Sequence, residues 1–259
     1  MKYNFVRINP NEGGVVAVET PDGRLPIRSF RDFYAFEQHV KAARARRGVD
    51  MIPDWYKIAV FYFSNSHSLL LDGEDLQFPS AGEWLDFELE VGAVIGRECR
   101  NVKAEDAEQY ILGYTVINDW SLRDAQKAEM VMNLGPAKGK DFATTLGPVL
   151  VTPDELEAKR SGKGFDLQMT CHVNGREISR GNWNSIHFSF GEMIERASNG
   201  VTLYPGELIG SGTVGTGCIL ELGPENTGGW IKSGDVVDLE IEGLGKISNK
   251  VAGAAASAG

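Results

Sequence analysis

The chain has 259 residues, of which 42% are hydrophobic and 24% charged, the composition of a globular protein that can bury a sizeable core. Its formal net charge is −10 and its dense basic run is RARRG at 44–48, which disfavours nucleic acid or an anionic membrane surface as a partner. Three separated cysteines without a CxxC pair (Cys99, Cys171 and Cys218), an N-terminus without an apolar signal segment and a longest apolar run of IAVFYF lead us to expect a soluble, cytoplasmic protein with reduced thiols.

The N-terminal part of the chain is predicted to contain strands with a helix between them. Residues 4–19 and 58–63 have the composition of strands. In SFRDFYAFEQHVKAARARRG, Ser29 with Asp32 matches a capping box, cations crowd the end, and Gly48 stands where a glycine often terminates a helix. The stretch therefore predicts a helix of about 15 residues.

The next predicted strand is LDFELEVGAVIG at 85–96, in which apolar residues alternate with Asp86, Glu88 and Glu90. Period-two alternation is typical of a strand with one buried face, and the acids share the other face. Residues two apart lie roughly 6.5 Å from each other along a strand. Two carboxylates at that spacing repel by under about 1 kcal/mol in water and by roughly 2–3 kcal/mol at an effective dielectric of 20. An exposed pair needs no partner, whereas an enclosed pair needs a cation.

Farther along the chain, residues 104–112 are predicted to form a helix that ends at Gly113. YTVIND at 114–119 is predicted to be a strand whose apolar run stops at an acid. SFGEMIERASNG predicts a third helix, which is capped by Ser189 with Glu192 and ends at Gly200.

The remaining sequence is mostly β in character. LQMTCHVNGREI contains an Asn174-Gly175 hairpin signal, and GCILEL, DVVDLEIEGL and KISNKV are predicted to be short strands. Strands and helices do not alternate regularly and no repeat is present in the sequence. These features predict a β-rich α+β fold, a rolled or sandwiched sheet with a few peripheral helices. The small-residue tail VAGAAASAG is expected to fray.

Taken singly, the candidate functional residues leave alternatives open. GSGTVGTG contains GxGxxG, but a strand is predicted after it, so a tight glycine turn is favoured over nucleotide binding. Asp119 ends a strand, where a turn or capping role is common. Asp32 and His39 would share a helix face about 10 Å apart, which suits either a ligand and a base or two ordinary polar positions. His67, His172 and His187 lack zinc-site spacing, and no GxSxG serine-hydrolase motif is present.

Six segments together resemble the fumarylacetoacetate hydrolase family, in the family's order and from about residue 30 to 245. They are DFYAFEQH (32–39), MIPDWYKIAVFY (51–62), DFELEVGAVIG (86–96), GYTVINDWSLRDAQ (113–126), GKDFATTLGP (139–148) and GSGTVGTGCILEL (210–222). The resemblance implies a mixed β-sandwich roll, usually dimeric, that holds a divalent cation. We expect a short N-terminal β segment (1–25), a catalytic domain (26–252) and a flexible tail (253–259).

The resemblance also implies roles for individual residues. The metal ligands would be Asp32, Glu88, Glu90 and Asp119, an all-oxygen set that suits Mg²⁺ best and also Ca²⁺ or Mn²⁺. His39 would be the base that activates water, oriented by Glu221. Arg123, Gln126 and Lys140 would stabilise the oxyanion, Tyr34, Tyr62 and Thr213 would contact substrate, and Lys140 and Thr144 would lie beside the metal. Asp86 is left as an acid on the solvent side.

The favoured hypothesis is a metal-dependent hydrolase that cleaves a carbon–carbon bond in a 1,3-diketone acid such as fumarylacetoacetate. The combination of Asp32, His39 and Glu221 favours it over the family's acylpyruvate-cleaving branch. Two departures bear on the substrate. The arginine nine residues after the base is replaced by Gly48, with Arg46 and Arg47 just before it, and only about 25 residues precede the match. The alternatives are decarboxylation, hydration or isomerisation of 2-oxo acids at the same site, and a non-catalytic Ca²⁺-binding protein.

Overall fold

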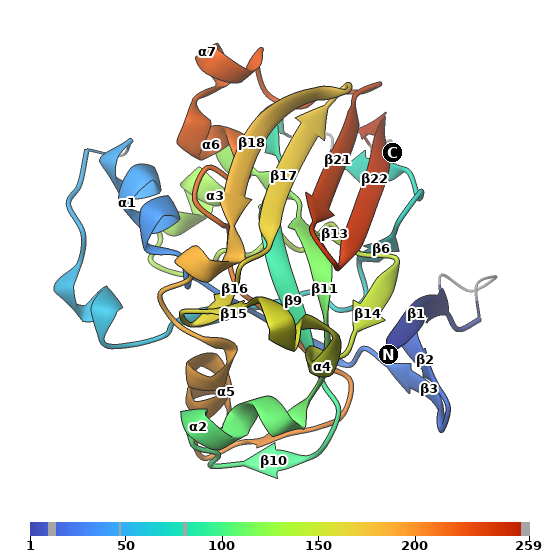
Figure 1. Cartoon of the computed structure of the whole chain (residues 1–259). Coiled ribbons are helices and arrows are strands. Elements are labelled where there is room, and N and C mark those ends of the chain that lie inside the picture. The colour runs from blue at the N-terminus through green and yellow to red at the C-terminus, as the bar shows by residue number, and fades with distance from the viewer. Residues whose placement is uncertain (10–13, 47, 80–81, 255–259) are drawn as a thin grey trace.

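The computed structural model describes residues 1–9, 14–46, 48–79 and 82–254. Its largest element is an 11-stranded sheet with the order β3-β2-β1-β14-β11-β9-β20-β4-β5, in which β13 pairs with β11 and β6 (Figure 1). The strands of this sheet are β1 (Lys2–Arg7), β2 (Val16–Thr20), β3 (Gly23–Pro26), β4 (Ser29–Phe33), β5 (Phe61–Ser64), β6 (Leu69–Leu71), β9 (Leu89–Ile95), β11 (Ile111–Asp119), β13 (Thr144–Leu146), β14 (Val149–Val151) and β20 (Glu207–Gly210).

A second sheet of five strands packs against the first and has the order β18-β17-β21-β22-β7. Its strands are β7 (Leu76–Phe78), β17 (Gln168–Val173), β18 (Arg176–Asn182), β21 (Val236–Ile241) and β22 (Gly245–Ala254). Three two-stranded ribbons complete the strand pairing. They are β8 (Leu85–Asp86) with β12 (Ser121–Leu122), β10 (Cys99–Arg100) with β19 (Thr202–Leu203), and β15 (Arg160–Ser161) with β16 (Gly164–Phe165). The β-rich α+β fold predicted from the sequence is confirmed.

Short helices lie around the sheets (Figure 1). The α-helices are α1 (Glu37–Ala45), α2 (Ala104–Ala107), α3 (Arg123–Met130), α4 (Pro153–Leu156), α5 (Phe190–Ser198), α6 (Ile219–Leu222) and α7 (Pro224–Thr227), and the 3-10 helices are η2 (Pro53–Tyr56), η3 (Glu108–Tyr110), η4 (Glu157–Lys159) and η5 (Trp183–Ser185). None of the helices in the described part of the chain has the length and hydropathy needed to cross a membrane.

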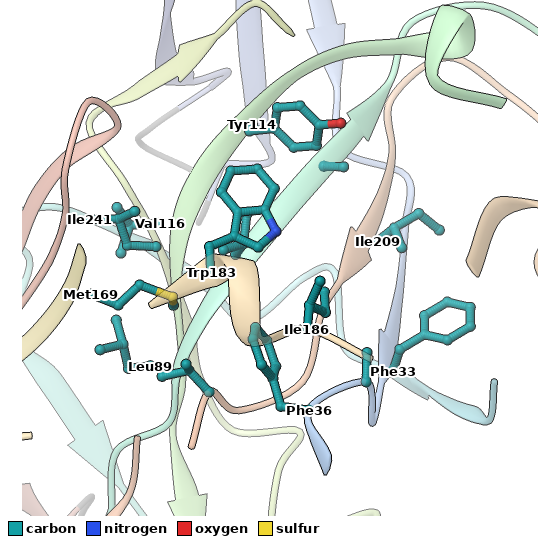
Figure 2. Close-up of a cluster of buried hydrophobic side chains, with 14 of the residues drawn as sticks. Phe33, Phe36, Leu89, Tyr114, Val116, Met169, Trp183, Ile186, Ile209 and Ile241 are labelled. Carbon is teal, nitrogen blue, oxygen red and sulfur yellow. The ribbon is translucent and has the colours of Figure 1, made fainter. Parts of the chain in front are cut away.

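The main hydrophobic core lies between the two sheets. Leu89 and Val116 from the large sheet meet Met169 and Ile241 from the five-stranded sheet, and Trp183 lies among them (Figure 2). The Trp183 ring lies 4.9 Å from the ring of Tyr114 and is fully buried. The three cysteines are also buried and form no disulfide.

The prediction that residues 85–96 form a half-buried strand is wrong. Every residue of β9 is buried, because a second core covers the other face of the large sheet. Val94 belongs to that second core, with Phe30, Ile117 and Leu208 from the neighbouring strands. Alternation in sequence therefore marked two different buried environments rather than a buried and an exposed face.

The predicted helix start at Ser29 is also wrong. Ser29–Phe33 forms β4, which pairs in parallel with β20 and antiparallel with β5. The helix α1 begins only at Glu37, and its N-cap Phe36 has no side-chain cap. Non-local strand pairing has overridden the local capping signature. Asp32 and His39 consequently do not share a helix, although Gly48 follows the helix end with a φ of +72° as expected.

Two more boundaries differ from the sequence predictions. The helix predicted at 104–112 ends at Tyr110, and Gly113 lies inside β11 at a register shift. GCILEL contains the short helix α6 instead of a strand. Residues of the predicted fraying tail up to Ala254 belong to β22 and pair with β7, and residues 255–259 lie outside the described part.

Other local predictions are confirmed. Ser189 and Glu192 form a capping box at the start of α5. Asn174 and Gly175, with φ of +51° and +78°, form the turn between β17 and β18. β11 ends at Asp119, as predicted for YTVIND. The strands β1, β2 and most of β3 lie in the segment 1–25 and belong to the large sheet, and the division of the chain after residue 25 stays a prediction.

Candidate active site

Four carboxylates converge at one place on the large sheet. An oxygen atom from each of Asp32, Glu88, Glu90 and Asp119 lies within 4.8 Å of the others. Asp32 comes from β4, Glu90 from β9, Asp119 from the end of β11, and Glu88 from the link between β8 and β9. All four side chains are buried. The structure thus brings together the whole set of residues that the resemblance suggested as ligands.

The register of the strands explains how these acids meet. Gly210 of β20 pairs with Gly92 of β9 on one side and with Asp32 of β4 on the other. A Cβ atom at Gly210 would lie only 2.4 Å from Asp32 Oδ1, so this position has to lack a side chain. Gly212, with a φ of +75°, donates its backbone N–H to the same oxygen at 3.3 Å. The GSGTVGTG segment is a glycine turn, and it shapes the Asp32 side of the cluster.

The four buried carboxylates repel one another electrostatically. Burial and the charge of Asp119 raise the pKa of Asp32 to about 8. Burial and the charges of Asp32, Glu88 and Asp119 raise the pKa of Glu90 well above its usual range. Within the described residues, neither oxygen of Glu90 accepts a hydrogen bond from an N–H or O–H donor. A proton shared with Asp32 or a bound cation would compensate this charge, so the donor set fits a divalent cation.

Two cations border the cluster on the Glu88 side. Lys140 Nζ contacts Glu88 and donates to Asp119 Oδ2 at 2.8 Å, and Arg123 Nη2 lies 2.7 Å from Glu88 Oε1. Burial alone would raise the pKa of Glu88, but the charges of Lys140 and Arg123 outweigh it and lower that pKa. Burial would lower the pKa of Lys140, yet Asp119 and Glu88 raise it. The cluster therefore combines an ionised Glu88 with carboxyls that ionise with difficulty.

A buried imidazole–carboxylate pair lies next to the acids. His39 Nδ1 is 3.0 Å from Glu221 Oε2, and the two side chains are only 6% and 5% exposed. His39 is presented by α1 and Glu221 by α6. A ring nitrogen of His39, Cys218 Sγ and a Glu88 oxygen lie within 4.8 Å of one another. The pair and the carboxylates thus face the same small space, although the helical spacing predicted for Asp32 and His39 is not how they meet.

The other side chains expected at the site lie around these groups. Tyr62 donates its hydroxyl to Asp119 Oδ2 at 2.6 Å, and Thr144 donates to Asp119 Oδ1 at 3.0 Å. The ring of Tyr34 meets that of His39 edge-on at 5.6 Å. Thr213 is buried in the glycine turn. Gln126 Oε1 accepts a hydrogen bond from Arg123 Nη1 at 2.9 Å.

Comparison with known proteins identifies the fold and the family. A sequence model described as the C-terminal region of fumarylacetoacetate hydrolase matches residues 28–252. The chain belongs to the fumarylacetoacetate hydrolase family. Members of the family are enzymes, and their names include hydrolases, isomerases and tautomerases. The resemblance noted in six sequence segments is therefore confirmed at the level of the family.

Individual relatives in the family differ in the reaction that they are named for. The chain is 36% identical over 173 residues to the 2,4-didehydro-3-deoxy-L-rhamnonate hydrolase of Sphingomonas sp., covering 66% of this chain and 57% of that one. It is 32% identical over 195 residues to the mitochondrial oxaloacetate tautomerase of Homo sapiens, covering 75% and 59%. It therefore spans less than two thirds of either relative.

A solved structure has the same fold. The fumarylpyruvate hydrolase of Pseudomonas aeruginosa, in complex with Mn²⁺ and pyruvate, superposes with a TM-score of 0.72 at 23% identity. The superposition covers 90% of this chain and 92% of that one.

The side chain of Arg46, one of the two arginines just before Gly48, contacts residues of α6 and α7. Its Nε donates to the backbone oxygen of Glu221 at 2.9 Å, and its Nη1 lies 3.3 Å from Glu225 Oε1. Arg46 therefore ties the end of α1 to α6 and α7. Arg47, the other arginine that could compensate for Gly48, lies outside the described residues.

The expectation for Asp86 is wrong, because this acid is fully buried and not on the solvent side. It forms an ion pair with Arg123 and accepts hydrogen bonds from the backbone of Ile219 and Leu220. The sequence prediction took residues 85–96 as one strand, whereas β8 ends at Asp86 and β9 begins at Leu89. The sequence feature that could have pointed to a place at the site was the position of Asp86 two residues before Glu88.

Proposed function

We propose that this chain is a divalent-cation-dependent hydrolase that cleaves a carbon–carbon bond in a 1,3-diketo acid, with fumarylacetoacetate as the first substrate to test. The observation that carries the proposal is the His39–Glu221 pair beside a buried cluster of four carboxylates. A structural cation site needs carboxylates but has no use for a buried imidazole with its own carboxylate partner. This argument disfavours a non-catalytic Ca²⁺-binding protein.

The donor set supports a hard cation. Asp32, Glu88, Glu90 and Asp119 would hold it through oxygen atoms alone, which suits Mg²⁺ first and Mn²⁺ or Ca²⁺ as alternatives. The Mn²⁺ in the fumarylpyruvate hydrolase from Pseudomonas aeruginosa supports a divalent ion in this family. When bound, the cation would act as a Lewis acid toward the keto oxygens of the substrate.

The imidazole of His39 would act as the general base. Because Nδ1 lies against the Glu221 carboxylate, the neutral ring carries its proton on Nδ1 and has a free lone pair on Nε2. Nε2 accepts a proton from water while the water oxygen bonds to one keto carbon. The bond between that carbon and the central carbon of the diketone then breaks, and the central carbon takes up a proton. Fumarylacetoacetate would yield fumarate and acetoacetate.

Fixed donors near the base would receive the oxyanion of the addition step. Arg123 is held by Asp86, Glu88 and Gln126, so its charge is fixed in place. Gln126 accepts through Oε1, which leaves its NH₂ group as the donor toward substrate. Lys140 brings a second positive charge beside Glu88 and Asp119. Such preorganised donors cost no rearrangement when charge develops.

The substrate would lie among aromatic and hydroxyl groups. Tyr34, next to His39, and Tyr62, bonded to Asp119, border the space that the base and the acids share, and Thr213 belongs to the adjoining glycine turn. Tyr62 keeps its proton at neutral pH, because burial and then Asp119 raise its pKa well above the usual range. Its single proton is donated to Asp119, and the hydroxyl oxygen can accept a hydrogen bond from a ligand.

A second candidate reaction is isomerisation, tautomerisation or decarboxylation of a smaller 2-oxo acid at the same site. The observation that favours it concerns the arginine that would bind the distal carboxylate of a longer substrate. Gly48 replaces the family's arginine, and Arg46 is already bound to Glu221 and Glu225. A substrate with a short tail needs no such arginine. The oxaloacetate tautomerase among the relatives supports the same alternative.

One assay separates the candidates. The loss of enol absorbance is followed with fumarylacetoacetate, acylpyruvates and oxaloacetate, each with added Mg²⁺ and then with EDTA. The proposal predicts Mg²⁺-dependent cleavage of a diketo acid into two acids. If the diketo acids are inert and oxaloacetate tautomerises or loses CO₂, the second candidate replaces the first. If all substrates are inert while cation still raises the melting temperature, a structural cation site is indicated.

A further inference from the structure

Asp86 binds through its side chain to the start of α6 and to the start of α3. Its Oδ1 accepts the backbone N–H of Ile219 at 2.7 Å. Its Oδ2 accepts the backbone N–H of Leu220 at 3.0 Å and the Nε–H of Arg123 at 2.8 Å. The side chain is fully buried, so no water competes for these bonds. Both carboxylate oxygens are therefore committed to fixed donors.

The groups that donate hydrogen bonds to Asp86 lie next to the base and to the carboxylate cluster. Ile219 and Leu220 are the two residues before Glu221, which pairs with His39. Arg123 opens α3 and reaches Glu88 with its Nη2 at 2.7 Å. A displacement of either donor would change the position of Glu221 or the neutralisation of Glu88.

The helix that carries Glu221 needs an external anchor. α6 has only four residues, and a single turn is unstable on its own because nucleation fixes many torsions for few hydrogen bonds. The first backbone N–H groups of any helix have no partner inside it. Asp86 supplies acceptors for two of them, and Cys218 Sγ accepts the N–H of Glu221 at a longer 3.4 Å. The place of Glu221 thus depends on Asp86 at the start of α6 and on Arg46, which donates to the backbone oxygen of Glu221.

We propose that Asp86 is a positioning residue that holds Glu221 against the His39 imidazole and keeps this pair in register with Glu88 through Arg123. Asp86 itself touches neither substrate nor the reacting atoms. The inference rests on the proposed role of His39 and Glu221, and it adds a residue that controls how well that pair is formed.

The test is Asp86→Asn, which keeps the shape but leaves one acceptor oxygen for three donors. We expect kcat to fall about 10–100-fold, as for other residues that orient a catalytic group. KM and the affinity for Mn²⁺, measured by calorimetry, should change less than about threefold, because Arg123 keeps its contacts with Glu88 and Gln126. In a Glu221→Gln background, Asp86→Asn should cost little more, since both changes remove the same support.

Asp235→Asn is the matched control. Asp235 is also a buried acid and lies just before β21. It accepts from the backbone of Lys232 at 2.9 Å and from Asn174 Nδ2 at 2.8 Å, and neither donor belongs to α6 or α3. We expect it to lower thermal stability without changing kcat. The proposal is overturned if Asp86→Asn leaves kcat unchanged, or if it lowers kcat by the same factor in the parent and in Glu221→Gln.

A substrate-free measurement separates failure of this inference from failure of the proposed function. The ¹⁵N resonances of the His39 ring report its tautomer and hydrogen bonding, and His39→Gln assigns them. Asp86→Asn and Glu221→Gln should shift these resonances in the same direction. If the parent cleaves no substrate but the shifts agree, the proposed reaction is wrong and the positioning role stands. If Asp86→Asn leaves the His39 resonances in place, the positioning role is wrong.

Discussion

Removing divalent cations should make the stability of this protein fall as the pH rises. Burial and Asp119 raise the pKa of Asp32 to about 8, and burial and Asp32 raise the pKa of Glu90 well above its ordinary range. The metal-free folded protein therefore holds protons that the unfolded chain has already released above about pH 5. When the folded state binds more protons than the unfolded state, the free energy of unfolding decreases with pH. Glu88 does not reverse this, because its pKa is lowered and it is ionised in both states over this range.

The magnitude follows from one proton. A group protonated only in the folded state changes the free energy of unfolding by about 1.4 kcal/mol per pH unit, so Asp32 alone contributes about 2.7 kcal/mol between pH 5 and pH 7. At about 2–4 °C per kcal/mol for a protein of this size, the melting temperature should drop by about 5–11 °C. Bound cation replaces these protons, so saturating Mg²⁺ or Mn²⁺ should flatten the dependence and raise the melting temperature most at high pH.

The assay is thermal unfolding followed by circular dichroism at pH 5, 6 and 7, in EDTA and in Mn²⁺. Glu90→Gln replaces one of the strained carboxyls by a neutral group, so it should reduce the pH dependence in EDTA and weaken the effect of Mn²⁺. Glu240→Gln, at an exposed position on β21, is the matched control and should behave as the parent. A melting temperature in EDTA that stays constant or rises from pH 5 to pH 7 would refute the electrostatic reasoning.

Two further predictions concern the scaffold. Gly210→Ala places a Cβ 2.4 Å from Asp32 Oδ1, so it should weaken Mn²⁺ binding at least about tenfold by calorimetry. The control Gly175→Ala, in a distant turn, should leave the Mn²⁺ affinity as in the parent. Unchanged affinity in Gly210→Ala would contradict the strand-register argument. Trp183→Ala empties the centre of the core and should cost about 3–5 kcal/mol in urea unfolding, with the same Mn²⁺ affinity when folded; a loss under about 1 kcal/mol would show that Trp183 is not central to the core.

Much of the site could be anticipated because its residues stand in short, ordered segments. Asp32, Asp119 and the pair Glu88 and Glu90 come from three separate segments, and they do converge. Periodicity alone could not have found this convergence. It depends on the pairing of β4 with β20 and of β20 with β9, which joins residues far apart in sequence. The resemblance to a family supplied the non-local information that the local pattern lacked.

The errors have a common physical origin in long-range contacts. Ser29 and Asp32 carry a good capping signature, yet pairing with β5 and β20 makes that segment a strand. GCILEL has strand-like composition, but Asp86 from a distant segment stabilises a helical turn there. Asp86 was expected to face solvent because its alternation with Glu88 and Glu90 was read as one continuous strand.

The central claim is that one group of acids holds a cation while His39 does the proton transfer. The most direct measurement compares His39→Ala and Glu88→Ala for Mn²⁺ affinity by calorimetry and for diketo-acid cleavage in the same preparations, with His172→Ala as the histidine control. The account predicts that His39→Ala binds Mn²⁺ nearly as the parent does and cleaves nothing, that Glu88→Ala loses both properties, and that His172→Ala keeps both. Activity in His39→Ala equal to that of the parent would contradict it.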